Sequence, residues 1–112
     1  MAKRYPYGPL SLSPMSTDST LRDFQALIRE RYFETDSARG VPATFLWFME
    51  EVGELSEAFA KRERGDGDDA NLREEFADVM AWLATLANIT GVDLADAIHE
   101  KYLADGGPKG TK

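Results

Sequence analysis

The chain has 112 residues, of which 43% are hydrophobic and 29% charged, a composition typical of one globular domain and too apolar for a disordered chain. It contains no cysteine, which excludes disulfides, thiolate metal sites and a cysteine nucleophile. The net charge of −7 disfavours a nucleic acid polymer as partner, whereas metal ions held by carboxylates would still allow a small anionic substrate.

The two ends of the chain differ in composition from its middle. Residues 1–18 contain three prolines and several serines, and residues 106–112 read GGPKGTK, so we expect a flexible N-terminal arm and a flexible tail around one domain at residues 19–105. No apolar run reaches the roughly 18 to 20 residues of a membrane span, and the N-terminus lacks the apolar segment of a signal peptide. We therefore expect no membrane partner and a cytoplasmic location.

The first predicted helix runs from Leu21 to Phe33. Thr20 and Asp23 have the spacing of a capping box, which marks a helix start, and the helix has an apolar stripe of Leu21, Phe24, Leu27, Ile28 and Tyr32. The segment DSARGVP, residues 36–42, is expected to break this helix. Pro42 suits the first turn of a second helix, which we extend to Gly65.

Two further helices are predicted in the second half of the chain. The third covers residues 72–90 and ends at Gly91, and Asp93 then caps a fourth over residues 94–104, which stops at Gly106. No segment shows the period-two alternation of a strand bounded by turns. The sequence therefore predicts an all-α, four-helix bundle whose core is an antiparallel hairpin of the second and third helices.

Acidic residues on the second predicted helix divide between two faces. At about 100° per residue, its core face comprises Phe48, Val52, Leu55 and Phe59, with Phe45 beside it. Glu51 and Glu54 lie about 60° and about 120° to one side of Phe48. Glu50 and Glu57 point nearly opposite to the core face. Two glutamates therefore lean toward the core and two lean toward water.

The third predicted helix repeats this arrangement. Its core sector is made of Leu72, Phe76, Val79, Met80, Leu83 and Ala87. Glu75 lies at the border of that sector, and Asp78 lies one step beyond the border. In an antiparallel hairpin, Glu51 and Glu54 would face this pair across the groove. Four converging carboxylates resist joint ionisation unless a hard cation binds them. Oxygen-only ligands favour Mg²⁺, with Mn²⁺ as a substitute, over zinc or copper.

The alternative is that EEVGE and EEFAD are solvated helix faces, which is what charge runs usually are. A lone Glu-x-x-Glu pair would be interpreted in that way. Two such pairs on consecutive helices, both shifted toward the apolar face, make a metal site the better interpretation. Glu57 and Glu74 are expected to be surface residues, and Glu50 is the best candidate for a supporting role.

The segments EEVGELSEAF and EEFADVMAWLATLAN together resemble the Glu-Glu-x-x-Glu and Glu-x-x-Asp signature of the MazG-like nucleotide pyrophosphohydrolases. The resemblance extends upstream through LRDFQALIRERYF and downstream through GVDLADAIHEKY, so it covers residues 21–102. It implies the all-α NTP pyrophosphatase fold. That family is usually a dimer or a dimer of dimers, so we expect a homodimer or homotetramer.

The resemblance also implies roles for particular residues. Glu51 and Glu54 match the first metal-binding pair and Glu75 and Asp78 the second, while Glu50 matches the leading glutamate and joins them as a catalytic candidate. The family cleaves nucleoside triphosphates between the α and β phosphorus atoms, giving a monophosphate and pyrophosphate. Carboxylate-held metals suit this chemistry because phosphoryl transfer needs mainly positioning and charge neutralisation.

Three further residues are weighed for the site. MazG-like chains commonly continue past the fourth helix with basic and amide residues that help hold phosphate, whereas this chain stops early. Lys101 is the only basic residue on the fourth helix and is the candidate phosphate contact, with an exposed solubilising lysine as the equal alternative. Trp47 lies beside Glu51 and could stack on a base, although core packing is the stronger interpretation. Asn88 matches a family position, and a polar contact at the helix end explains it as well.

Three functions remain open from the sequence. The leading one is Mg²⁺-dependent hydrolysis of (d)NTP to (d)NMP and pyrophosphate, in a house-cleaning role against non-canonical or surplus nucleotides. A phosphoribosyl-ATP pyrophosphatase-like enzyme would use a similar fold and similar metal chemistry. A non-catalytic helical dimerisation or regulatory module could retain the carboxylates without turnover.

Overall fold

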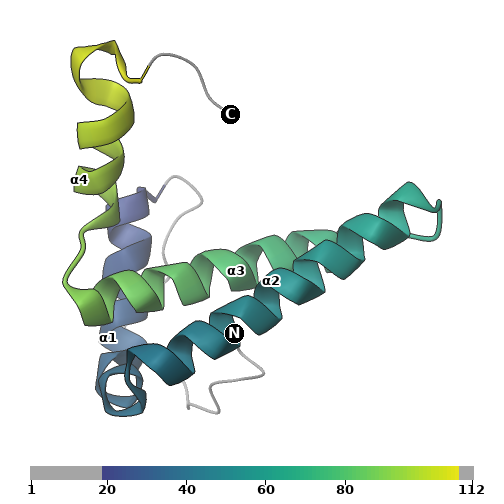
Figure 1. Cartoon of the computed structure of the whole chain (residues 1–112), viewed down its shortest axis with the longest axis horizontal. Coiled ribbons are helices and arrows are strands. Elements are labelled where there is room, and N and C mark those ends of the chain that lie inside the picture. Colours follow the sequence, from purple (N-terminus) through teal and green to yellow (C-terminus); the bar gives the residue numbers. More distant parts are fainter. Residues whose placement is uncertain (1–18, 109–112) are drawn as a thin grey trace.

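The computed structural model describes residues 19–108, and within them the fold is all-helical (Figure 1). The four α-helices are α1 (Leu21–Arg39), α2 (Val41–Glu63), α3 (Asp69–Thr90) and α4 (Leu94–Ile98). A π-helical turn, η2 (His99–Leu103), and a 3₁₀ turn, η3 (Ala104–Gly106), follow α4. Helices α2 and α3 form a long antiparallel hairpin, and α1 crosses it near one end and packs on α3. The predicted all-α fold with a hairpin core is therefore confirmed.

Parts of the predicted domain plan lie outside the described residues. The expected arm, residues 1–18, and the end of the expected tail, residues 109–112, are not described, so the predicted boundaries stay predictions. No helix within residues 19–108 is both long enough and apolar enough to cross a lipid bilayer.

Capping residues set the helix starts as the sequence indicated. Thr20 and Asp23 form a complete capping box at the start of α1, and Pro42 occupies the first turn of α2. Helix α3 starts three residues earlier than predicted, because the Asp68 carboxylate accepts hydrogen bonds from the backbone N–H groups of the first turn. It ends at Gly91, whose φ of 76° is in the left-handed region that favours glycine.

The first helix is longer than predicted, and the expected break over residues 36–42 is confined to Gly40. Helix α1 continues to Arg39, and only Gly40, with φ of 85°, separates it from α2. Asp36 is fully buried and pairs with Arg39 at 3.1 Å, while Arg39 also donates a hydrogen bond of 3.2 Å to the Thr44 hydroxyl. Arg39 thus links Asp36 of α1 to Thr44 of α2 across the junction. The polar residues at the end of α1 therefore have partners within the helices, and α1 turns into α2 without a loop.

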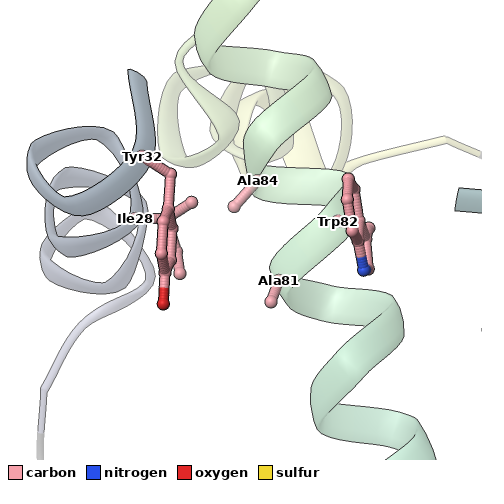
Figure 2. Packing of buried hydrophobic residues seen from close by; sticks show 5 residues of the cluster. All are labelled: Ile28, Tyr32, Ala81, Trp82 and Ala84. Carbon is pink, nitrogen blue, oxygen red and sulfur yellow. The ribbon is translucent and has the colours of Figure 1, made fainter. Parts of the chain in front are cut away.

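The buried core of the chain lies mainly between α1 and α3. Ile28 and Tyr32 of α1 face Ala81 and Ala84 of α3 (Figure 2). The small alanine side chains let the two helices approach closely, and Ala84 is completely buried. The indole of Trp82 points to the other side of α3 in the same view, and only 1% of this residue is exposed.

The chain's end is attached to α1 by polar contacts. Arg22 pairs with Asp93 and Asp96, and the hydrogen bond that it donates to Asp96, together with the charge of Asp93, raises the pKa of Arg22 above its ordinary value. The buried Gln25 donates hydrogen bonds to the Asn88 side chain at 3.0 Å and the Val92 carbonyl at 2.8 Å, and its own side-chain oxygen accepts from the Leu94 N–H. Asn88 therefore makes the helix-end contact that the sequence offered as one explanation.

The predicted fourth helix ends in a different geometry. The sequence favoured one α-helix over residues 94–104. The α-helix ends at Ile98, and the chain then continues as the π-helical turn η2 and the 3₁₀ turn η3. Gly107 closes this segment with φ of 77°, and a Cβ there would lie 2.5 Å from the Tyr102 carbonyl oxygen. Only glycine fits at that position.

The predicted apolar faces of α2 and α3 are only partly buried within one chain: Phe48 packs against the core, whereas the largest residues toward the hairpin connection are exposed. Phe59 and Phe76 are 41% and 49% exposed, and Phe45, Met80 and Leu83 are exposed as well. Of the predicted sector of α3, only Ala87 is buried; the other buried residues of this helix are Glu75, Asp78, Ala81, Trp82, Ala84, Thr85 and Asn88. The reason is that α1 and α2 both cover the carboxylate side of α3, which leaves the stripe of large residues uncovered.

Candidate metal centre

Four carboxylates from two helices meet inside the α2–α3 hairpin. Glu51 and Glu54 are three residues apart on α2, and Glu75 and Asp78 have the same spacing on α3, so each pair lies on one face of its helix. Because the helices are antiparallel and adjacent, the two faces meet (Figure 1). One carboxylate oxygen from each of the four residues lies within 4.8 Å of the others.

Burial distinguishes these carboxylates from ordinary surface acids. Glu51 is 0% exposed, Glu75 4% and Asp78 6%, while Glu54 is partly exposed. Carboxylates are almost never buried this deeply unless a partner or a metal compensates their charge. The solvated-face interpretation is thereby excluded for Glu51, Glu75 and Asp78.

The donor set fits a hard divalent cation. Oxygens on opposite sides of an octahedral Mg²⁺, each about 2.1 Å from the ion, are about 4.2 Å apart. The largest oxygen separation in the cluster is no more than 4.8 Å, so side-chain rotations alone could close the cluster around an ion. All four ligands are carboxylates, which suit magnesium or manganese better than zinc or copper.

A second network holds the helix junction beside the cluster. Arg39 is mostly buried between Asp36 and Thr44, and its guanidinium lies 5.2 Å from the centre of the Trp82 ring. Trp82 follows Asp78 by one helical turn, so this contact ties the α1–α2 junction to the part of α3 that carries the acids. Trp82 thus packs in the interior.

The other candidate residues are not members of the cluster within the described chain. Glu50 and Glu57 are exposed, and Glu57 pairs with Lys61 at 3.4 Å on the surface of α2. Trp47 is one turn before Glu51 and is 39% exposed, so the core packing that the sequence favoured for it is wrong within one chain. Lys101 lies on η2, which packs on α4 and η3, and its ammonium group is 5.5 Å from the Tyr102 ring centre. The structure therefore brings together only the four carboxylates.

A groove that the sequence did not anticipate adjoins the cluster. It has a volume of about 520 Å³, lies between the first half of α1 and α3, and has Asp78 in its wall. Most of its lining is apolar, including Phe24, Ile28 and Met80. Helical periodicity places residues on faces but gives no packing distance between helices, so a groove of this kind leaves no signal in the sequence.

Comparison with protein families agrees with this geometry. The model for the MazG nucleotide pyrophosphohydrolase domain matches residues 40–103, more than half of the chain. The chain belongs to the MazG family. It is accordingly a hydrolase that acts on phosphoanhydride bonds of nucleotides, and the metal dependence of MazG enzymes fits the buried acidic cluster. Among curated proteins, no match to the chain was found.

The matched region contains the whole hairpin and all four carboxylates, as well as α4 and η2. It begins at the glycine that separates α1 from α2. Helix α1, which forms one wall of the groove beside Asp78, lies outside the match. The hairpin thus carries the MazG signature.

Proposed function

We propose that this MazG protein is a Mg²⁺-dependent nucleoside triphosphate pyrophosphohydrolase that converts (d)NTP to (d)NMP and pyrophosphate. The observation that carries the proposal is the convergence of four carboxylates, three of them buried, within 4.8 Å between α2 and α3. Glu51, Glu54, Glu75 and Asp78 would hold the metal, with Mn²⁺ able to replace Mg²⁺. A house-cleaning role against non-canonical or surplus nucleotides is consistent with this reaction.

The charges of substrate and site require the cation. A triphosphate is strongly anionic, and it would have to approach a chain of net charge −7 at a cluster of four acids. Divalent ions held by Glu51, Glu54, Glu75 and Asp78 would reverse the local sign and would supply charge neutralisation and an activated water. The protein's part is to fix the ion positions, which a rigid helical hairpin does well.

The bond cleaved can be established by isotope labelling. In the proposed reaction a water oxygen bonds to the α-phosphorus, the bond from that phosphorus to the bridging oxygen breaks, and pyrophosphate leaves with the bridging oxygen. Hydrolysis in H₂¹⁸O, followed by mass spectrometry, should place the label in the monophosphate. Label in pyrophosphate would indicate attack on the β-phosphorus, and release of orthophosphate and a diphosphate would contradict the proposal.

We also propose that the chain acts as a homodimer or homotetramer. The exposed stripe along the hairpin includes Phe59 and Phe76, whose rings meet edge to face with centres 5.6 Å apart, together with Phe45, Met80 and Leu83. Large exposed apolar patches on small domains usually mark interfaces. A symmetric dimer would pair this stripe with its copy in a self-complementary contact.

An oligomer would also bear on the remaining candidate residues. Lys101 does not reach the carboxylates of its own chain, so as a phosphate contact it would have to act across a subunit interface. Trp47, one turn from Glu51, offers a partly exposed indole on which a base could stack. For the exposed Glu50 we propose a supporting role that is weaker than that of Glu51.

The decisive test of the reaction is a product assay. Purified protein with Mg²⁺ is incubated with a panel of nucleoside and deoxynucleoside triphosphates, and with phosphoribosyl-ATP as the comparison substrate. Monophosphate and pyrophosphate should appear in equal amounts from at least one triphosphate. Turnover of phosphoribosyl-ATP alone would show that the protein is a phosphoribosyl-ATP pyrophosphatase and not a general nucleoside triphosphate pyrophosphohydrolase. No turnover of any nucleotide would contradict the proposal.

A further inference from the structure

Among the described residues, Arg31 differs from the other arginines of α1 in having neither a charged partner nor an aromatic ring beneath its guanidinium. Arg22 pairs with Asp93 and Asp96, Arg39 pairs with Asp36, and Arg29 stacks on the Phe33 ring at 3.7 Å. Within residues 19–108, Arg31 forms no ion pair, and its Nε atom is shielded from solvent without a hydrogen-bond partner. A shielded guanidinium nitrogen without a partner is costly, so such groups commonly have a binding role.

The position of Arg31 suggests what it binds. It lines the groove between α1 and α3, and it is the only basic residue among the described residues of that groove. Asp78, one of the four clustered carboxylates, lies in the same groove. The remaining walls are largely apolar, with Phe24, Ile28, Tyr32 and Met80 among them. One groove therefore combines an apolar surface, the positively charged guanidinium of Arg31 and one carboxylate of the acidic cluster.

We propose that Arg31 is a substrate-contacting residue whose guanidinium binds a phosphate oxygen of the nucleotide. The nucleoside lies against the apolar walls of the groove, and the phosphates extend toward Asp78 and the metal. This inference rests on the proposed triphosphate substrate. The planar guanidinium suits the geometry of phosphate oxygens, and charge-assisted hydrogen bonds of this kind are stronger than neutral ones. The groove's volume of about 520 Å³ is within the usual range of ligand pockets.

The test compares Arg31→Met with a matched control, Arg29→Met. Methionine keeps an apolar stem against the groove wall, and Arg31 loses no ion pair within the described chain, so the variant should fold. Arg29 is on the same helix but does not line this groove. Thermal unfolding of both variants checks the fold before any binding is measured.

The probe is inorganic tripolyphosphate, which carries the anionic groups without a base. With Mg²⁺ present, calorimetry should show that Arg31→Met weakens its binding about tenfold or more, whereas Arg29→Met changes it little. Arg31→Lys should restore part of the affinity, because it returns the charge but not the planar donor geometry. Steady-state kinetics on the best triphosphate should show the same order of variants.

Two outcomes would overturn the inference. Unchanged tripolyphosphate binding in Arg31→Met would show that Arg31 does not contact phosphate. Weaker nucleotide binding with unchanged tripolyphosphate binding would also contradict the inference, because Arg31 would then contact the nucleoside and not the phosphates. Failure of the proposed function looks different: the wild-type protein would hydrolyse no triphosphate at all, whatever residue stands at position 31.

Discussion

Glu51 of α2 and Glu75 of α3 are both almost completely buried, and an oxygen of one lies within 4.8 Å of an oxygen of the other. Two buried carboxylates so close together repel each other, because the protein interior screens charge less than water does. A bound divalent cation turns this repulsion into joint coordination. The arrangement is therefore costly without metal and favourable with it.

The first prediction concerns neutralising one carboxylate. Glu51→Gln should lower activity more than about a hundredfold, since even residues that only orient metal ligands cost about 10- to 100-fold when changed. In metal-free buffer the variant should unfold at the same temperature as wild type or higher, because one repulsive charge is gone. Steady-state assays and thermal melts in EDTA provide the two measurements.

The matched control for that variant is Glu57→Gln, on the same helix. Glu57 is exposed and its ion pair with Lys61 is at the surface, so the change should alter stability by less than about 1 kcal/mol and leave activity near that of wild type. Equal loss of activity in the two variants would mean that the buried cluster is not the catalytic site.

The second prediction concerns metal and stability. Mg²⁺ at a concentration about 100 times its dissociation constant should stabilise the folded protein by about 2.7 kcal/mol, because it binds only the native cluster. Differential scanning calorimetry should show this as a rise in melting temperature that NaCl of equal ionic strength does not reproduce. The rise should disappear in Glu51→Gln. A melting temperature that Mg²⁺ leaves unchanged would argue against a preformed metal site.

The third prediction concerns the packing of α1 on α3. Ala84 is completely buried where α1 crosses, so Ala84→Leu should overpack the contact and cost about 1 to 3 kcal/mol of unfolding free energy. The control, Ala70→Leu, adds the same atoms at an exposed position near the start of α3 and should be nearly neutral. Urea denaturation measures both, and equal costs would mean that α1 does not pack closely on Ala84.

The convergence of the four carboxylates could be predicted from sequence because it depends on spacing within single helices. Glu51 with Glu54 and Glu75 with Asp78 are each set by three-residue spacing, and the short connection between the helices made an antiparallel hairpin the natural arrangement. The structure places these four together as predicted. Glycine and aspartate signals likewise located the end of α3 and the start of α4.

The burial pattern could not be predicted because it depends on where a third helix docks. The large residues Phe59 and Phe76 dominate the apolar periodicity, yet α1 covers the side of α3 that carries Ala81 and Ala84. Small residues give a weak signal in a sequence but allow the closest helix contacts. The full length of α1 was also hidden, because it depends on the partners that Asp36 and Arg39 find in three dimensions.

The fourth prediction follows from the exposed stripe. Light scattering should report at least twice the 12.5 kDa mass of one chain at micromolar concentration. Phe76→Ser should shift the mass toward the monomer, because Phe76 is an exposed member of the stripe whose ring packs on Phe59. Leu46→Ser, an exposed position about 160° around α2 from Phe48, should leave the mass unchanged. A wild-type protein that is active as a monomer would refute the proposed interface.

The most direct test of the metal centre is Mn²⁺ binding followed by electron paramagnetic resonance, because free Mn²⁺ gives a signal that is lost on coordination. Wild-type protein should bind Mn²⁺ and release it to excess Mg²⁺, whereas the double variant Glu51→Gln/Glu75→Gln should remain folded and bind none at the same concentration. Mn²⁺ binding of equal affinity and stoichiometry in the folded double variant would show that the four carboxylates do not form the metal site.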